Sequence, residues 1–511
     1  MPTLREYLRT EKSLTPVDQS MPRSWNWQKA KYLASTNRVI EVGMNKVFET
    51  DWLGSAPLFY NVKTGKVSHN INNVIEFADL EFDPEGFNNY LDFGYSILEQ
   101  TPVRHVKFLR HSARLSFDDN GKINVDYLDD PTDRWLDLRL SESDIFDLLQ
   151  SRIRNWEHSC SGEIIITTSG GYDTRLLNLM IEDKSRVRSF TYGISEKQSD
   201  SFEVVYAKRL SELLGTRWEQ IPLGDLFLYF EDWDKLFGVS THAHGMYHIE
   251  FYKKILPKVS GGNPFLSGII GDIWAGNWNI PPIDNPGDLK HLGRTYGMNA
   301  DSTMSQLKSK RFMLEDYFSC YTERLQDPRL RIIEAVRFKI ILLSYLMTVP
   351  SSFGFKPWSP FPDIEVAMAM LMLPQERRQN RIWQREFFQK QGVDFESMNI
   401  KVDMANTLSQ QAMRRIHLKP LDSKLLLEVV KSEYVEWINR QVRQQGILWE
   451  WFWKLANSPR IGKPMRMFGV KEQRLQALSA YLTLKPIESL LLKRDACRDK
   501  KQNPLIKESR F

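Results

Sequence analysis

The spacing of apolar positions changes along the chain and predicts two kinds of structure. Between about Arg38 and Asp126, short apolar stretches such as VFETDW, PLFYNV and KVSHNI alternate with turn residues, which predicts a small, mostly β region. Within it, Pro84 to Tyr95 is expected to form a helix, because FNNYLDFGY repeats apolar residues at helical spacing. Farther along, apolar β-branched runs alternate with amphipathic stretches, which is the pattern of an α/β fold.

Four buried strands are predicted in the α/β part. Glu163 to Thr168 is a continuous β-branched run, typical of a strand buried on both faces of a parallel sheet. RSFTYG, RWEQIPL and PFLSGII are the other three, and FEVVYAKRLSELLG predicts a helix ended by Gly215. From about Glu315 the chain is expected to be mainly helical, with GILWEWFWKLAN and KEQRLQALSAYL as later pieces. The predicted fold class is an α/β doubly wound parallel-sheet domain with a helical C-terminal part, preceded by a smaller, mostly β (α+β) domain.

The same pattern suggests four segments. We expect an irregular arm at 1–37, a mostly β domain at 38–135, the α/β domain at 136–410, and a helical extension with a basic tail at 411–511. From Lys493 to Phe511 the chain has seven Lys or Arg against three Asp or Glu, a net charge of +4. We interpret this segment as a solvated, partly frayed tail; the alternative is an electrostatic contact with a membrane or a polyanion.

Composition adds mainly exclusions. A net charge of +5 on 511 residues is too weak to predict a nucleic-acid-binding protein. The three cysteines, Cys160, Cys320 and Cys497, lie far apart and form neither a disulfide framework nor a CxxC metal pair. The N-terminus lacks the apolar stretch of a signal peptide, and the longest apolar run, Ile340 to Met347, is too short to cross a bilayer. We therefore expect a cytoplasmic protein without a transmembrane segment.

The strongest chemical signal is Ser169 to Arg175, the sequence SGGYDTR between a predicted strand and a predicted helix. Two glycines allow a tight turn that brings backbone N–H groups close to an anion, and the helix N-terminus adds positive potential. Ser169 and Thr174 can donate hydrogen bonds to phosphate oxygens. Asp173 would repel phosphate alone, so a divalent metal is expected beside it. The alternative is a plain Gly-Gly turn with a capping Asp. Since neither GxxxxGK[ST] nor a strand followed by GxGxxG occurs, the loop predicts a different solution to ATP binding.

This loop resembles the pyrophosphate loop of enzymes that split ATP between the α and β phosphates, such as NAD, GMP, argininosuccinate and asparagine synthetases. Ser267 to Asp272 resembles the SGxGxD segment of asparagine synthetase-like enzymes, and Pro360 to Asp363 resembles their PFxD segment. Asp51 to Tyr95 is similar to the second half of the glutaminase domain that precedes this synthetase. The common order of these segments over residues 38 to 405 identifies a resemblance to the asparagine synthetase-like family.

The resemblance implies an ATP-dependent C–N ligase that adenylates a carboxylate, releases pyrophosphate and AMP, and transfers ammonia or an amine to the acyl group. It implies Mg2+ held by Asp173 and Asp272. A lysine that neutralises pyrophosphate and the developing oxyanion is implied at Lys401, with Lys390 as the alternative. The residues implied to bind ATP and pyrophosphate are Ser169, Gly170, Gly171, Asp173, Thr174, Tyr192, Ser267 and Gly268.

Two departures from the family bear on the second half of the reaction. The family's glutaminase uses an N-terminal Cys, whereas this sequence begins Met1-Pro2-Thr3 and its first Cys is Cys160, so we expect a glutaminase-like domain without that activity. Ile269 stands where asparagine synthetases have Glu and β-lactam synthetases have Tyr, and Ile270 replaces the middle glycine. Since Ile cannot exchange a proton, the product need not be asparagine.

The substrates therefore stay open. The carboxylate belongs to a small molecule or a glycan, as in sugar-acid amidation or natural-product biosynthesis, and the nitrogen comes from free ammonia, a separate ammonia-supplying partner or an amine. A true asparagine synthase using ammonia and a non-catalytic ATP-binding scaffold are the alternatives, and homo-oligomerisation is not decided. His242, His244 and His248 suggest either a metal site or a polar cleft rim with helix capping.

Overall fold

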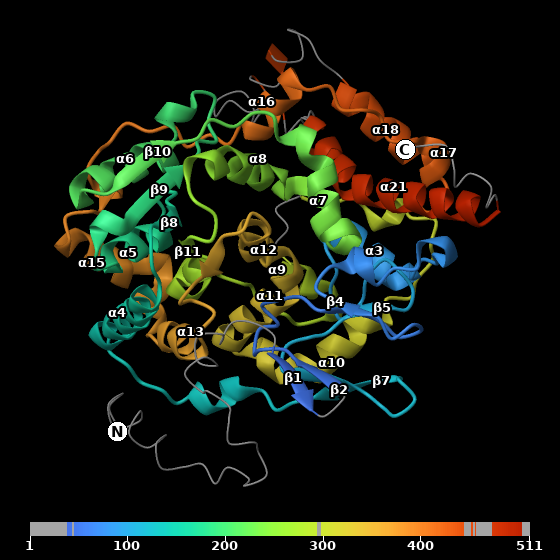
Figure 1. Ribbon diagram of the computed structural model, residues 1–511, viewed down its shortest axis with the longest axis horizontal. Helices are drawn as coiled ribbons and strands as arrows, with labels where there is room; N and C mark the ends of the chain where they lie inside the picture. The colour runs from blue at the N-terminus through green and yellow to red at the C-terminus, as the bar shows by residue number, and fades with distance from the viewer. Residues whose placement is uncertain are drawn as a thin grey trace.

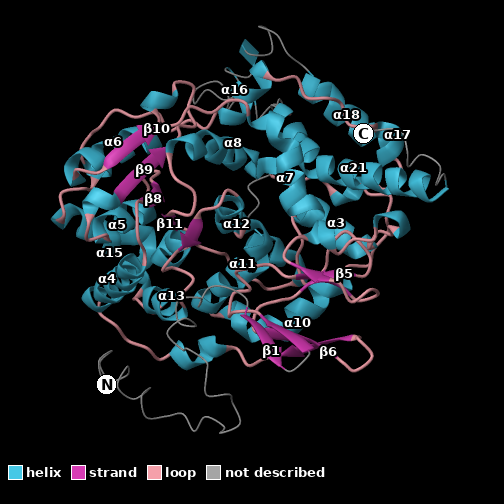
Figure 2. Cartoon of the chain, viewed as in Figure 1, coloured by secondary structure: helices cyan, strands magenta, loops and turns pink. Residues whose placement is uncertain are grey.

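The computed structural model contains a five-stranded parallel sheet and describes residues 38–42, 45–293, 298–443, 451–452, 455, 465 and 473–502. The strands lie in the order β10-β9-β8-β11-β12 (Figures 1 and 2). Their bounds are β8 Ile164–Thr167, β9 Val187–Thr191, β10 Arg217–Gln220, β11 Pro264–Leu266 and β12 Lys356–Trp358. The four predicted strands are confirmed, although β11 is shorter than PFLSGII, and the three-residue β12 lies outside the prediction.

The strand order creates a switch point in the middle of the sheet. From β8 the chain moves outward through β9 to β10, then returns to β11 on the other side of β8 and continues to β12. Helices α5 (Tyr172–Met180) and α6 (Phe202–Leu214) connect the first three strands and pack on them. Gly215 ends α6 in a left-handed conformation with φ of 66°, as predicted. In an α/β sheet of this kind, ligands bind at the carboxyl ends of the strands that flank the switch point.

The N-terminal region consists of two smaller antiparallel sheets and one helix. One sheet has the order β1-β2-β6-β7 and the other β4-β3-β5. The expected helix is confirmed as α3, Pro84–Phe93, which is capped by Asp83 and ended by Gly94 with φ of 81°. The largest hydrophobic core runs without interruption from this region into the parallel-sheet part. The bounds of the seven strands are β1 Arg38–Val42, β2 Asn45–Glu49, β3 Phe59–Asn61, β4 Val67–Ser68, β5 Val106–Phe108, β6 Ala113–Phe117 and β7 Ile123–Tyr127.

Helices make up most of the remaining chain and surround the parallel sheet (Figure 2). The expected helical C-terminal part is confirmed, and KEQRLQALSAYL lies largely in its long last helix, whereas most of GILWEWFWKLAN and the 1–37 arm lie outside the described residues. The predicted domain boundaries remain predictions. The other helices are α4 Glu142–Ser159, α7 Phe230–Phe237, α8 Met246–Ile255, α9 Lys290–Gly293, α10 Phe312–Gln326, α11 Pro328–Leu343, α12 Tyr345–Ser352, α13 Ile364–Leu371, α14 Gln375–Arg378, α15 Ile382–Lys390, α16 Leu408–Arg415, α17 Ser423–Leu426, α18 Ser432–Arg443 and α21 Arg474–Gln502.

The last helix corrects one expectation. The interpretation of residues 493–511 as a frayed tail is wrong for its first ten residues, because α21 continues to Gln502 and packs between α18 and the N-terminal region (Figure 1). Four of its cations have protein partners: Lys493 Nζ lies 2.6 Å from Asp234 Oδ2, Arg494 Nη1 lies 2.6 Å from Glu428 Oε2, Arg498 Nε donates to Ala78 O at 3.1 Å, and Lys501 Nζ lies 3.3 Å from Asp79 Oδ1. These cations are thus paired with groups of the protein itself rather than left available to a polyanion.

Among the described helices, none combines the length and the apolar character required to cross a membrane.

Candidate functional site

Two loops meet at the carboxyl ends of β8 and β11, the neighbouring strands at the switch point of the sheet. The loop after β8 begins at Ser169 and leads into α5, and the loop after β11 runs from Ser267 to Asp272. They touch directly, since a Cβ atom built on Gly268 would lie only 3.2 Å from Cβ of Asp173. Two segments that are almost a hundred residues apart in the sequence therefore form one site.

The first loop requires glycine at its centre. Gly170 has φ of 69°, and a Cβ atom on it would lie 2.5 Å from Cβ of Tyr206, so a side chain meets both backbone strain and a collision. Gly171 precedes α5, whose first turn has no side-chain cap. Free N–H groups at a helix N-terminus attract anions, and the helix dipole adds to the attraction. The hydroxyls of Ser169 and Thr174 lie 3.4 Å apart beside this turn.

Asp173 and Asp272 form a carboxylate pair in front of the loop. The backbone N–H of Asp272 donates a hydrogen bond to Asp173 Oδ2 at 2.7 Å. Asp173 Oδ1 is buried and has no hydrogen-bond partner among the described residues. Burial, followed by the negative charge of Asp272, raises the pKa of the Asp173 carboxyl well above its usual value, while Arg381 and the Asp272 N–H act in the opposite direction. Asp272 Oδ2 accepts a hydrogen bond from Asn277 Nδ2 at 2.7 Å.

This pair fits a magnesium ion. A buried carboxylate with an unpartnered oxygen beside a second carboxylate lacks positive charge, and Mg2+ prefers oxygen ligands of this kind. The described part of the chain brings no three His, Cys, Asp or Glu residues together as a metal cluster. Mg2+ is commonly bound by one or two carboxylates together with water and substrate phosphates, so a two-carboxylate contribution is sufficient.

The second loop holds a conformation that is unusual for its sequence. Ile270 has φ of 58°, in the left-handed region that β-branched residues rarely adopt. The resemblance places a glycine at this position, so the sequence departs from the family pattern where the backbone retains a conformation that suits glycine. Gly271 keeps its glycine, and a Cβ atom there would lie 2.7 Å from the ring of Phe361 and 2.9 Å from Cγ of Asp173. Ser267 Oγ accepts a hydrogen bond from the N–H of Ile269 at 3.3 Å.

Arg175 holds the first loop through a hydrogen bond to its backbone, and the sequence did not predict it as a site residue. Its side chain is fully buried, and Nη2 donates to Gly170 O at 2.7 Å. The guanidinium also donates to Val393 O at 3.0 Å and to both oxygens of Glu396 at 2.8 and 2.9 Å. It lies against four aromatic rings, those of Tyr172, Tyr206, Phe388 and Phe395. The only sequence signal for this role is that Arg175 falls on the inner, apolar face of an amphipathic helix.

A second unanticipated cation lies nearer to the carboxylates. The Arg381 guanidinium stands over the Tyr172 ring, 4.1 Å from its centroid, and its charge acts on Asp173. Its backbone has φ of 56°. By contrast, Lys401 is exposed and its charge acts on Asp200, and Lys390 at the end of α15 acts on Glu386. Among these three cations, the structure therefore relates Arg381 most directly to the carboxylate pair.

Tyr192 and Glu203 lie on the β9 side of the site. The Tyr192 ring packs edge-on against Tyr247 and Phe251, with centroids 5.7 and 5.0 Å away, so its ring belongs to an aromatic cluster around α8. Glu203 lies in the first turn of α6, and its carbonyl would be 3.2 Å from a Cβ atom on Gly170. Burial, together with Asp403, raises the pKa of Glu203 to about 7. Because this carboxyl titrates near neutral pH beside the loop, Glu203 is a functional candidate. The segment FEVVYAKRL gives no sign of it, since it has only an ordinary amphipathic pattern.

His242 and His248 are buried and His244 is half-buried, and the three side chains form no metal cluster among the described residues. His242 Nδ1 accepts from the N–H of His244 at 3.2 Å, which is the capping role considered for this run. His244 Nε2 lies 3.4 Å from Ser479 Oγ, whereas His248 packs against Tyr345 with ring centroids 5.0 Å apart. Burial lowers the pKa of His244 and of His248 to about 3, which keeps both rings neutral. These three histidines thus contribute to packing and capping.

Solved structures that resemble part of this chain include two NAD synthetases. One is the NH3-dependent NAD synthetase from Campylobacter jejuni subsp. jejuni NCTC 11168 in complex with the nitrate ion, with a TM-score of 0.23 and 13% identity over 41% of this chain and 97% of that one. The other is the glutamine-dependent NAD+ synthetase from Acinetobacter baumannii in complex with ADP, with a TM-score of 0.21 and 13% identity. This second match covers 46% of this chain and 41% of that one. No protein-family model matches the chain, and no curated protein matches it.

Proposed function

We propose that the protein is an ATP-dependent amide-bond synthase, a C–N ligase that forms AMP and pyrophosphate in the manner of asparagine synthetases. The observation that carries this proposal is the pair of Asp173 and Asp272 in front of an uncapped, glycine-lined helix N-terminus at the switch point of the sheet. A plain Gly-Gly turn with a capping Asp does not account for a buried carboxylate oxygen without a partner.

The chain's own groups supply binding and charge. The N–H groups of Gly170, Gly171 and the first turn of α5 bind the leaving pyrophosphate, assisted by the hydroxyls of Ser169 and Thr174. A magnesium ion held by Asp173 and Asp272 would neutralise phosphate charge. The substrate carboxylate attacks the α-phosphorus, pyrophosphate departs, and ammonia or an amine then displaces AMP from the acyl-adenylate. The protein contributes positioning and electrostatic stabilisation.

The cation beside the leaving group is proposed to be Arg381. Its charge acts to lower the pKa of Asp173, and its guanidinium packs over the Tyr172 ring. A planar guanidinium binds two phosphate oxygens at once, so an arginine suits this task. Lys401 remains the candidate that the family resemblance implies. It lies beside Asp200, immediately before α6, and therefore on the same edge of the sheet.

The nitrogen donor is proposed to be free ammonia, ammonia from a partner, or an amine. The three cysteines of this sequence lie just after α4, in α10 and in α21, and not in the antiparallel sheets where the resemblance locates a glutaminase. The acyl donor is proposed to be a small-molecule or glycan carboxylate. Amidation of a sugar acid and a natural-product coupling are the two pathways to which the resemblance points.

The test is the identity of the nucleotide products. The purified protein is incubated with ATP, Mg2+, ammonium and a panel of carboxylates, and the nucleotides are resolved by chromatography while pyrophosphate is measured by a coupled assay. AMP and pyrophosphate in equal amounts, dependent on one carboxylate, are expected. ADP and inorganic phosphate would contradict the proposal. ATP binding without any turnover across the panel would favour the non-catalytic scaffold.

Asp173→Asn tests the role of the carboxylate pair, because it keeps the shape of the side chain and removes the charge. Loss of one charge that supports a transferring phosphoryl group costs about 100-fold or more in rate. Asp183→Asn, at an exposed carboxylate that caps a turn after α5, should retain full activity. Equal activity of the two variants would exclude the carboxylate pair from the reaction.

A further inference from the structure

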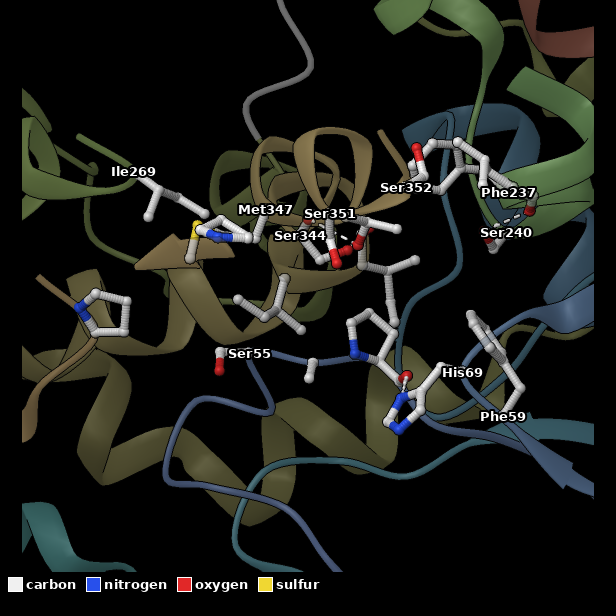
Figure 3. Close-up of a pocket in the computed structure, with 18 of the residues that line it drawn as sticks. Ser55, Phe59, His69, Phe237, Ser240, Ile269, Ser344, Met347, Ser351 and Ser352 are labelled. Carbon is white, nitrogen blue, oxygen red and sulfur yellow. Dashed lines mark hydrogen bonds between the residues drawn. The ribbon is translucent and has the colours of Figure 1, made fainter. Parts of the chain in front are cut away.

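A cavity of about 470 Å³ lies where the antiparallel region meets α11 and α12, behind the second loop of the site (Figure 3). Ile269 and Met347 lie at one end, and Phe59 and His69 lie at the other. Since Ile269 and Ile270 belong to the segment that ends at Asp272, one wall of the cavity is the back of the carboxylate site. The described lining residues are Ser55, Ala56, Pro57, Phe59, His69, Leu236, Phe237, Ser240, Ile269, Ile270, Ile340, Ile341, Ser344, Met347, Thr348, Ser351, Ser352, Pro357 and Pro362.

The lining is apolar with scattered hydroxyls, and His69 is the one titratable side chain among the described lining residues. Among the described lining residues none is Asp, Glu, Lys or Arg. Several hydroxyl protons are already used: Ser240 donates to Phe237 O at 2.6 Å, Ser344 to Ile341 O at 2.9 Å, Thr348 to Ser344 O at 3.1 Å and Ser352 to Val349 O at 2.7 Å. Ser55 donates in the same way to the Asp51 carboxylate. A hydroxyl whose proton is engaged presents only its oxygen lone pairs, so these side chains can accept hydrogen bonds from a ligand.

We propose that this cavity, which borders the loop that ends at Asp272, binds the amine substrate as an uncharged primary amine with an apolar body. This inference rests on the proposed amide-forming function. An apolar lining disfavours the charged ammonium and favours the free amine, which is also the nucleophilic form. Acceptor hydroxyls match the two N–H groups of such an amine.

Size and charge exclude the other two reactants from this cavity. Ammonia occupies about the volume of a water molecule, roughly 30 Å³, which would leave most of the space empty. A substrate carboxylate needs a cation or N–H donors, and the lining offers engaged hydroxyls instead. The charged groups on neighbouring elements are occupied elsewhere: Asp51 accepts the N–H groups of Leu53 and Ser55, and Asp363, beside Pro362, pairs with Arg152 at 3.1 Å.

Hexylamine, a six-carbon primary amine, is the probe, and binding to the whole protein is measured by calorimetry without turnover. The amine pKa is about 10.4, so the free-amine fraction rises about tenfold per pH unit between pH 7 and 9, and the apparent affinity should rise equally. Hexanol should bind independently of pH, and hexanoate should not bind. His69 is the titratable lining residue, with its Nδ1 bonded to Pro57 O at 2.8 Å. His69→Gln should keep the pH slope, because the slope belongs to the ligand.

Three variants locate the binding. Ala56→Leu fills part of the cavity and should abolish hexylamine binding, whereas Thr64→Leu introduces the same side chain at an exposed turn and should leave binding unchanged. Thr348→Val keeps the volume and removes one acceptor, which should weaken binding by about fivefold, the typical value of one hydrogen bond. A flat pH profile, hexanoate binding as tight as that of hexylamine, or equal effects of Ala56→Leu and Thr64→Leu would overturn the assignment.

Failure of this inference differs from failure of the proposed function. If no carboxylate yields AMP but hexylamine binds as described, the ligase proposal fails and the amine site stands. If a carboxylate yields AMP and pyrophosphate but only ammonia enters the product, even with hexylamine in excess, the cavity is not the amine site. Formation of the hexylamide in place of the primary amide supports both.

Discussion

Replacement of Arg175 by lysine tests how the pyrophosphate loop is held. The arginine makes four hydrogen bonds from a fully buried position, to Gly170 O, to Val393 O and to both carboxylate oxygens of Glu396. Lysine keeps the positive charge, but a single ammonium cannot reproduce a planar fork that reaches three acceptor groups. The substitution therefore removes geometry while it preserves charge.

The expected loss follows from these contacts. A lysine that retains its contact with Glu396 gives up the two bonds to the backbone carbonyls of Gly170 and Val393, both of which stay buried. At about 1.5 kcal/mol for each bond from a charged donor, the free energy of unfolding should fall by about 3 kcal/mol. Arg104→Lys is the matched control, since its partner Glu81 lies 2.7 Å away on the surface with both side chains about half exposed. Its cost should stay below about 0.5 kcal/mol.

Urea unfolding of both variants, followed in parallel by circular dichroism and tryptophan fluorescence, measures the difference. ATP affinity in the presence of Mg2+ should also fall, by about tenfold, because the freed Gly170 carbonyl must be ordered at a cost of about 1.4 kcal/mol of binding energy. Equal unfolding midpoints for Arg175→Lys and Arg104→Lys would refute the view that this buried fork holds the loop. Lower stability with unchanged ATP affinity would show that Arg175 stabilises the fold without affecting the ATP site.

Three further outcomes are expected. Gly170→Ala should cost about 3 kcal/mol and abolish ATP binding, because strain and a collision combine there, whereas Gly215→Ala, with φ of 66° and no atom within 4 Å of the new Cβ, should cost only about 1 kcal/mol. Folding raises the pKa of Glu203 from about 4.5 in the unfolded chain to about 7, so ionisation of this carboxyl opposes folding. The free energy of unfolding should therefore fall as the pH rises from about 4.5 to about 7. Glu203→Gln should have a higher urea midpoint than the wild type at pH 8 and the same midpoint at pH 5. Lys493→Ala should lower the thermal midpoint at a cost of about 2 kcal/mol, since it leaves the buried Asp234 carboxylate with the Ser489 hydroxyl but without its cation. Lys501→Ala, whose ion pair is exposed, should change stability by less than about 0.5 kcal/mol.

Local patterns were sufficient to predict the first loop and its surroundings. The β-branched run became β8, and the two glycines turned the chain where expected. Gly215 ended α6 in the left-handed conformation that glycine favours. In each case the residues that determine the structure are neighbours in the sequence, so periodicity and turn chemistry contained the necessary information.

Features that depend on distant partners were not accessible in this way. Glu396 lies 221 residues after Arg175, and no local pattern relates the two. Spacing from a family segment suggested Lys401 as the cation for pyrophosphate, and that assignment stays a prediction. No local pattern pointed to Arg381, whose charge acts on Asp173 and which follows a first left-handed residue, Asn380. Glu203 is read as an ordinary surface position of a helix until burial against another segment changes its pKa.

The basic tail shows the same limit in terms of charge. A net +4 over residues 493–511 predicts solvation when the segment is considered alone. In the folded chain, acidic side chains from three other segments meet these cations, and residues 493–502 belong to one long helix. Composition describes what a segment carries, whereas the partners that neutralise it are set by the fold.

The long C-terminal helix also has a consequence for how the protein is made. The Tyr90 hydroxyl donates to Thr483 O across 393 residues of sequence, and Lys501 meets Asp79 across 422. At about 5 to 20 residues per second, a ribosome needs roughly 20 to 80 seconds to synthesise that intervening chain. During this interval α3 and the turn at Asp79 lack one of their covering surfaces, so the nascent protein offers chaperones and proteases an incomplete face until α21 has been synthesised.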